Sequence, residues 1–222
     1  MTTTYRAALA GALFLVLLTG IICRFHTPPP TVHLIACVDA SQSDRPNLPA
    51  SIEASVRIYR ALYPGRDFLS LYRLDDQLLP LHDDRVRDTP ATYEDLMVTE
   101  LTPISSQDNT YTEKFWLAAA QSAAEDNMPV IIVFFTDGFS EGTSKQGHRM
   151  IQQAAAALAA NPHVFAVVIL GAAPETWSSL EADLYPLRRH LGRDCFVIQS
   201  DCNATAALSL IAAARAEGGK SK

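Results

Sequence analysis

Oxygen-bearing side chains stand at two places in the sequence in a pattern suited to a hard metal ion. Asp39, Ser41 and Ser43 occupy alternate positions of one segment, and alternate residues of an extended chain point to the same side. Asp137 belongs to a later Thr-Asp-Gly turn, and Thr110 lies between the two segments. Two carboxylates and three hydroxyls that meet at one point would form a site for Mg²⁺ or Mn²⁺, with water or a ligand completing the octahedron.

The composition narrows the partners that such a site would serve. After residue 30 the chain has 16 Lys and Arg against 24 Asp and Glu, a formal charge of −8, whereas proteins that bind duplex nucleic acid carry a basic surface. We therefore expect no nucleic acid partner. The four cysteines, at positions 23, 37, 195 and 202, form no CxxC pair and no cluster with histidine. Neither zinc nor a disulfide framework is expected.

The first thirty residues differ in character from the rest of the chain. Residues 7–23 are uncharged and mainly apolar, and Arg6 and Arg24 flank them. They would form ~25 Å of helix, at the short limit for crossing a bilayer. A cleaved signal peptide is the alternative, but no small-x-small cleavage site follows the apolar stretch. We predict three parts: a membrane anchor or uncleaved signal at 1–26, a proline-rich spacer at 27–31 and one domain at 32–222.

Six short apolar runs, several of them rich in valine, isoleucine and phenylalanine, predict strands covered on both faces. They are residues 32–38, 68–74, 77–82, 130–136, 164–170 and 195–200. Amphipathic or alanine-rich stretches predict helices at 50–63, 114–125, 146–160, 174–191 and 204–216. Pro186 should interrupt the fourth helix, and Asp75-Asp76 predicts a hairpin between the second and third strands. This order predicts an α/β fold, a doubly wound and mainly parallel six-stranded sheet with one antiparallel edge strand.

In a sheet of this kind, ligands bind beyond the carboxyl ends of the strands. The segment of Asp39 directly follows the first predicted strand, and the segment of Asp137 follows the fourth. The fold therefore predicts that the two carboxylates lie at the same edge of the sheet.

An Asp-x-Ser-x-Ser segment after a first strand, a later threonine and a Thr-Asp-Gly segment after a further strand resemble the von Willebrand factor A (vWA) domain and its metal-ion-dependent adhesion site (MIDAS). The resemblance covers essentially all of residues 32–216. It implies a divalent cation whose open position takes a carboxylate from a partner protein. The ligands implied by the resemblance are Asp39, Ser41, Ser43, Thr110 and Asp137.

We call the segments that carry Asp39, Thr110 and Asp137 the first, second and third loops. The second loop departs from the pattern of the family, which often has glycine before the threonine. This chain has Asp108 and Asn109 there, so Thr112 remains an alternative to Thr110. Asp108 and Glu141 are candidates to accept hydrogen bonds from metal-bound water. Phe115 and Trp116 are also bulkier than is common in the family.

A second motif points to a different class of protein. Ser140 stands in a Gly-x-Ser-x-Gly segment like the nucleophile elbow of a hydrolase, but Thr136 and Asp137 intervene before the first glycine. The acid and base on offer, such as Asp183 and His190, fall on one predicted helix, whereas a triad draws them from separate loops. We expect no enzymatic activity. The alternatives are a serine hydrolase, a metal-assisted hydrolase that uses the same carboxylates, and a metal-free scaffold.

The sequence therefore predicts a single-pass membrane protein with a vWA-like domain that binds a protein partner through Mg²⁺ or Mn²⁺. An anchor that also serves as an export signal would place the domain outside the cytoplasm.

Overall fold

The computed structural model describes residues 30–102, 110–139 and 143–218. The predicted anchor, residues 7–23, lies outside these ranges. Within them, no helix combines the length and the apolar character needed to cross a bilayer.

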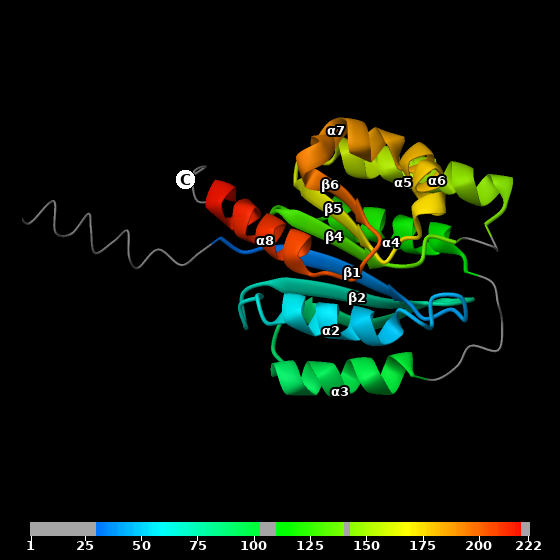
Figure 1. The fold of residues 1–222 in the computed structure, drawn as a ribbon. Coiled ribbons are helices and arrows are strands. Elements are labelled where there is room, and N and C mark those ends of the chain that lie inside the picture. The colour runs from blue at the N-terminus through cyan, green and yellow to red at the C-terminus, as the bar shows by residue number, and fades with distance from the viewer. Residues whose placement is uncertain (1–29, 103–109, 140–142, 219–222) are drawn as a thin grey trace, which may run out of the picture. The chain divides into compact units, whose positions relative to one another are not determined.

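The centre of the domain is a six-stranded sheet, which Figure 1 shows between its helices. Its strands are β1 (His33–Asp39), β2 (Phe68–Leu74), β3 (Leu78–Arg85), β4 (Val130–Phe135), β5 (Val164–Leu170) and β6 (Phe196–Gln199). They lie in the order β3-β2-β1-β4-β5-β6. Neighbouring strands are parallel except β2 and β3, which form the predicted antiparallel hairpin at one edge. The predicted six-stranded sheet with one antiparallel edge strand is confirmed.

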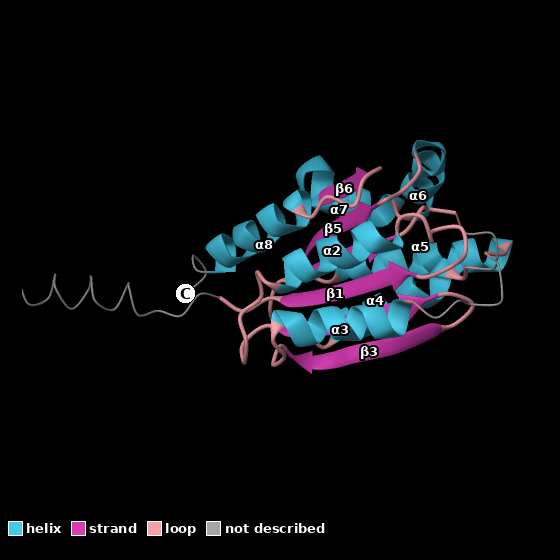
Figure 2. Cartoon of the chain, turned by 60° about the horizontal axis from the view of Figure 1, so that its bottom comes forward, coloured by secondary structure: helices cyan, strands magenta, loops and turns pink. Residues whose placement is uncertain are grey.

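Helices cover both faces of the sheet (Figure 1; Figure 2). One face packs against α2 (Leu48–Tyr59), α3 (Pro90–Leu101) and α8 (Thr205–Gly218). The other face packs against α4 (Thr112–Ala124), α5 (Lys145–Ala160), α6 (Trp177–Asp183) and α7 (Tyr185–Cys195). The sequence did not predict α3. The stretch 174–191 is divided into a short 3₁₀ turn, α6 and α7, and Pro186 lies in the first turn of α7, where proline is tolerated.

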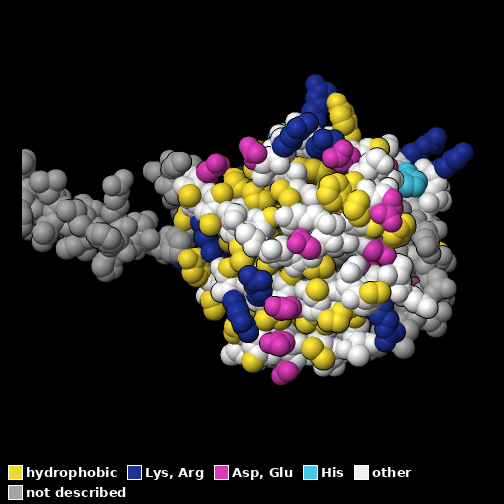
Figure 3. Space-filling model, viewed as in Figure 1, with side chains coloured by type: hydrophobic (Ala, Val, Ile, Leu, Met, Phe, Trp, Pro, Cys, Tyr) yellow, Lys and Arg dark blue, Asp and Glu magenta, His cyan; other side chains and the backbone are white. Residues whose placement is uncertain are grey.

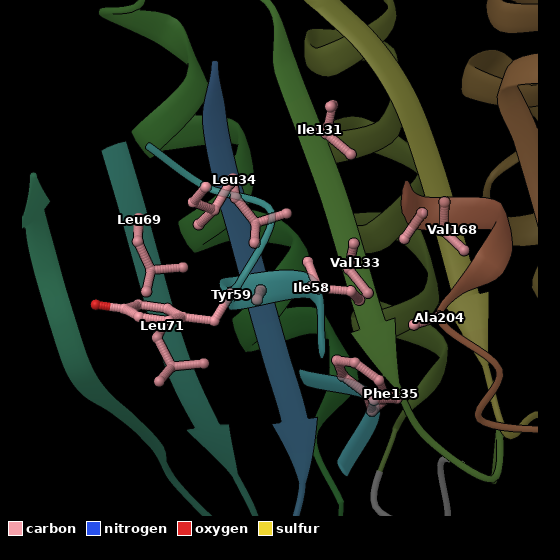
Figure 4. Close-up of a cluster of buried hydrophobic side chains, with 14 of the residues drawn as sticks. Leu34, Ile58, Tyr59, Leu69, Leu71, Ile131, Val133, Phe135, Val168 and Ala204 are labelled. Carbon is pink, nitrogen blue, oxygen red and sulfur yellow. The ribbon is translucent and has the colours of Figure 1, made fainter. Parts of the chain in front are cut away.

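The two central strands are buried on both faces, which explains their continuous apolar sequences. Figure 4 shows the cluster on the α2 side, where side chains of four strands meet those of α2. On the opposite face, the rings of Phe115 and Trp116 in α4 lie 4.8 and 5.9 Å from the ring of Phe134. These bulky residues therefore form the core behind the second loop.

At the amino ends of the parallel strands, one buried carboxylate joins three segments. The side chain of Asp67 accepts hydrogen bonds from the backbone N–H groups of Val32 and Tyr63, at 3.0 and 2.6 Å. It also forms an ion pair with Arg215 of α8, whose guanidinium stacks 3.9 Å from the centre of the Tyr63 ring. This contact fixes the last helix to the sheet at the end opposite the predicted metal site.

Candidate metal centre at the carboxyl ends of β1 and β4

The positions of Asp39 and Asp137 follow from the register of two central strands. β1 and β4 are parallel neighbours, and Val38 is paired with Phe135. The residues that follow, Asp39 and Thr136, therefore leave the sheet side by side. The strand order also reverses its direction between β1 and β4: β2 and β3 lie on one side of β1, and β4, β5 and β6 lie on the other. A crevice at such a switch point is the usual ligand site of a doubly wound sheet.

Asp39 is fully buried and joins the first loop to the third. Its Oδ1 atom accepts a hydrogen bond from the backbone N–H of Ser41 at 2.9 Å. Its Oδ2 atom accepts one from the hydroxyl of Thr136 at 3.0 Å. Both hydrogen bonds fix the carboxylate, so its orientation is set before any ligand binds.

The two serines of the first loop lie next to each other. The Oγ atoms of Ser41 and Ser43 are 3.2 Å apart, with Ser41 buried and Ser43 exposed. The two hydroxyls therefore lie on one side of the loop, but residues 41–47 form a bend and turns rather than the extended chain on which the spacing argument rested.

The third loop is a tight turn around Asp137. The Oδ1 atom of Asp137 accepts a hydrogen bond from the N–H of Phe139 at 2.9 Å, and the backbone carbonyl of Asp137 accepts one from the N–H of Ala173 at 2.8 Å. Gly138 has a φ of +84°, and its N–H donates to the hydroxyl of Thr136. The positive φ and these hydrogen bonds explain why glycine stands here.

The second loop is described only from Thr110 onward, so Asp108 lies outside the described residues, as does Glu141 in the third loop. Thr110 is buried directly before α4. The hydroxyl of Thr112, the alternative ligand, lies 3.5 Å from that of Thr143, which in turn donates to Glu113. Thr112 thus contacts the chain that follows the third loop.

The carboxylates of Asp39, Asp44 and Asp137 repel one another at this end of the sheet. The pKa of Asp39 is raised to about 7, chiefly by burial and also by the charge of Asp137, although the hydrogen bonds from Ser41 and Thr136 act in the opposite direction. The pKa of Asp44 is raised to about 8, chiefly by burial and also by the charges of Asp39 and Asp137, while the hydrogen bond from Asn47 acts in the opposite direction. A bound cation would offset this repulsion.

The donor set fits a hard divalent cation. Among the described residues, no three His, Cys, Asp or Glu side chains lie close enough to hold a metal by themselves, so hydroxyls must complete the coordination. Carboxylate and hydroxyl oxygens suit Mg²⁺ or Mn²⁺. In addition, the buried Oδ2 atom of Asp44 has no hydrogen-bond partner among the described residues.

Sequence reasoning missed the roles of two residues at this site. Thr136 was noted only as part of Thr-Asp-Gly, yet its hydroxyl binds Asp39. Asp44 was not noted, although it directly follows Ser43 and is fully buried. The register of β1 and β4 could have identified Thr136, whereas the burial of Asp44 depends on the packing of the loop.

Replacing Gly138 with alanine is expected to weaken metal binding and to lower the melting temperature. A Cβ atom there would lie 2.2 Å from Oγ1 of Thr176, on a backbone with φ of +84°, so the Asp137 turn must shift. Gly65→Ala is the control, because Gly65 has a similar φ of +73° but nothing within 4 Å of its Cβ position. Equal melting temperatures and equal Mn²⁺ affinities for the two variants would contradict this expectation.

Without metal, the stability of the domain is expected to fall as the pH rises from the ordinary pKa of an aspartate to about 7. Folded Asp39 has the higher pKa, so in this interval the folded state holds a proton that the unfolded state releases. Asp39→Asn should remove this part of the dependence. The check is thermal unfolding in EDTA between pH 5.5 and 7.5, where parallel curves for the two proteins would count against it.

The sequence matches no protein-family model and no curated protein. The fold, however, is similar to those of solved structures. Proximal thread matrix protein 1 (PTMP1) from the mussel byssus has a TM-score of 0.60 at 12% identity over 85% of this chain and 46% of that one. The pilus adhesin SpaC from Lactobacillus rhamnosus GG has a TM-score of 0.61 at 12% identity over 86% and 30%.

A von Willebrand factor type A structure from Catenulispora acidiphila has a TM-score of 0.54 at 17% identity, over 85% of this chain and 43% of that one. In a further structure of PTMP1 the MIDAS motif is occupied by zinc. This chain thus spans less than half the length of these proteins. The similarities show that it has a vWA-like fold.

Proposed function

We propose that this protein is a membrane-anchored vWA-like domain that binds a protein partner through a divalent cation, Mg²⁺ or Mn²⁺. The observation that carries the proposal is the buried Asp39 carboxylate, which is hydrogen-bonded to both the first and the third loop at the switch point of the sheet. Asp39, Ser41 and Ser43 would hold the cation directly. Thr110 and Asp137 would bind it directly or through water.

The partner would supply an acidic side chain to the open position of the cation. A metal held partly by neutral hydroxyls keeps enough positive charge to attract a carboxylate. The adhesin and the byssus protein with similar folds agree with a role in protein binding. On the face that carries α2, α3 and α8, acidic and basic side chains are interspersed (Figure 3), which suits a protein partner better than a nucleic acid.

Two pairs of histidine and acid bear on the alternative of a serine hydrolase. Asp183, the acid considered for Ser140, pairs with Nδ1 of His148 at 2.6 Å and not with His190; Ser140 itself lies outside the described residues. At the far end of the sheet, His33 lies between Asp126 and Ser70.

In the group at the far end of the sheet, a histidine lies between an acid and a serine as in a catalytic triad, but the serine cannot act as a nucleophile. Ser70 is fully buried, and its hydroxyl donates to Asp83 at 2.6 Å. A nucleophilic serine must be accessible and must give its proton to the histidine. The group formed by Asp126, His33, Ser70 and Asp83 therefore suits a structural role that joins β1, β2, β3 and the end of α4.

Residues 7–23 would anchor the protein, with the domain outside the cytoplasm. Protease added to intact cells should then degrade the domain, and degradation only after lysis would contradict this orientation.

The binding function is tested with the full chain as bait in membranes of its own organism. We expect a partner that is retained in Mg²⁺, lost in EDTA, lost with the Asp39→Ala bait, and lost again when one of its own acidic residues is replaced. Ser140→Ala is the control and should retain the partner. Binding that resists both EDTA and Asp39→Ala would favour the metal-free scaffold.

A further inference from the structure

The aspartate that directly follows the Asp-x-Ser-x-Ser segment is held in an unusual environment. Asp44 is fully buried. Its Oδ1 atom accepts a hydrogen bond from the side-chain amide of Asn47 at 2.9 Å, and its carbonyl accepts one from the N–H of Asn47. Its Oδ2 atom has no hydrogen-bond partner among the described residues. The turn between Asp44 and Asn47 therefore fixes one carboxylate oxygen and leaves the other without a donor.

The surroundings of Asp44 increase the cost of this arrangement. A buried carboxylate without a full set of partners is unfavourable, and the like charges of Asp39 and Asp137 act on it as well. The hydroxyl of Ser51 does not supply the missing hydrogen bond to Asp44, because it is paired with Sγ of Cys202 at 3.3 Å. A positive ion at the end of β1 and β4 would attract all three carboxylates and so offset the repulsion among them.

We infer that Asp44 supports the cation site through water, with Oδ2 as the free acceptor for a water molecule bound to the ion. This inference rests on the proposed metal site and adds to it a residue that the Asp-x-Ser-x-Ser motif does not contain. The first loop thus places two negative charges near the cation, those of Asp39 and Asp44.

Asp44→Asn separates this role from a purely structural one, because the amide keeps the shape and can still accept from Asn47. We expect the variant to bind Mn²⁺ at least about tenfold more weakly, the range found when groups behind metal ligands are removed. We also expect its melting temperature in EDTA to be unchanged or higher, because the variant lacks a buried carboxyl group that the charges of Asp39 and Asp137 repel. Cooperative unfolding in EDTA shows that the variant folds, and Asp44→Ser is the second variant if it does not.

The measurement is a Mn²⁺ titration of the full chain in mild detergent, read from the electron paramagnetic resonance of free Mn²⁺. The matched control is Asp201→Asn, which removes an exposed charge from the loop before α8 and should change neither quantity. Mn²⁺ affinity equal to that of the wild type in Asp44→Asn would overturn the inference alone. Absence of Mn²⁺ binding in the wild type would overturn the proposed metal site together with it.

Discussion

Asp67→Ala is expected to destabilise the domain by about 3–5 kcal/mol, because it removes one partner of a buried ion pair. The carboxylate is fully buried and the side chain of Arg215 is 12% exposed, so the guanidinium would lose its counter-ion in a place that water hardly reaches. The N–H groups of Val32 and Tyr63 would lose their acceptor as well. For a domain of this size the loss corresponds to roughly 6–20 °C in melting temperature.

Two controls separate the burial of this pair from its charge. Asp67→Asn keeps an acceptor for the backbone and should lose less than the alanine variant. Glu94→Ala breaks a pair with Arg60 in which both side chains are more than half exposed, and pairs of that kind contribute about 0–1 kcal/mol. A melting temperature of Asp67→Ala no lower than that of Glu94→Ala would show that Asp67 does not hold α8 to the sheet.

Asp39→Ala is expected to abolish the stabilisation of the domain by Mg²⁺. A ligand at about 100 times its dissociation constant adds about 2.7 kcal/mol to the free energy of unfolding, or about 5–10 °C here. In the part of the chain that the structure describes, Asp39 is the one carboxylate hydrogen-bonded to both the Ser41 segment and Thr136, so its loss would remove a ligand and also the link between two loops.

The behaviour without metal distinguishes this effect from general damage. Asp39→Ala removes two hydrogen bonds but also a buried charge that the charge of Asp137 opposes. The difference in melting temperature between Asp39→Ala and the wild type should therefore be smaller in EDTA than in Mg²⁺. A Mg²⁺-dependent rise that persists in the variant would mean that the ion binds elsewhere.

The strands of this fold could be predicted from the sequence because burial on both faces leaves continuous apolar runs, as in Val130–Phe135. The helix α3 could not, because only Tyr93, Met97 and Leu101 of its twelve residues are buried and so narrow a stripe gives a weak periodic pattern. The contact between Asp67 and Arg215 joins residues 148 positions apart, and no local pattern indicates it.

At the candidate site, too, some features could be predicted from the sequence and others depend on the folded chain. The segment with Asp39, Ser41 and Ser43 is a local pattern, so the sequence could indicate these residues, but the extended loop expected for them is a series of turns. The hydrogen bond from Thr136 to Asp39 depends on the register of β1 against β4. The burial of Asp44 is a property of the folded chain, in which a turn with Asn47 holds one of its carboxylate oxygens.

The proposal that β1 and β4 hold a divalent cation is tested most directly by equilibrium binding of Mn²⁺ to the full chain. The account predicts one bound Mn²⁺ per chain at millimolar concentration or below, displaced by excess Mg²⁺ and lost in Asp39→Ala. Folded wild-type protein that leaves Mn²⁺ free at millimolar concentration, or Asp39→Ala protein that binds it equally well, would contradict it.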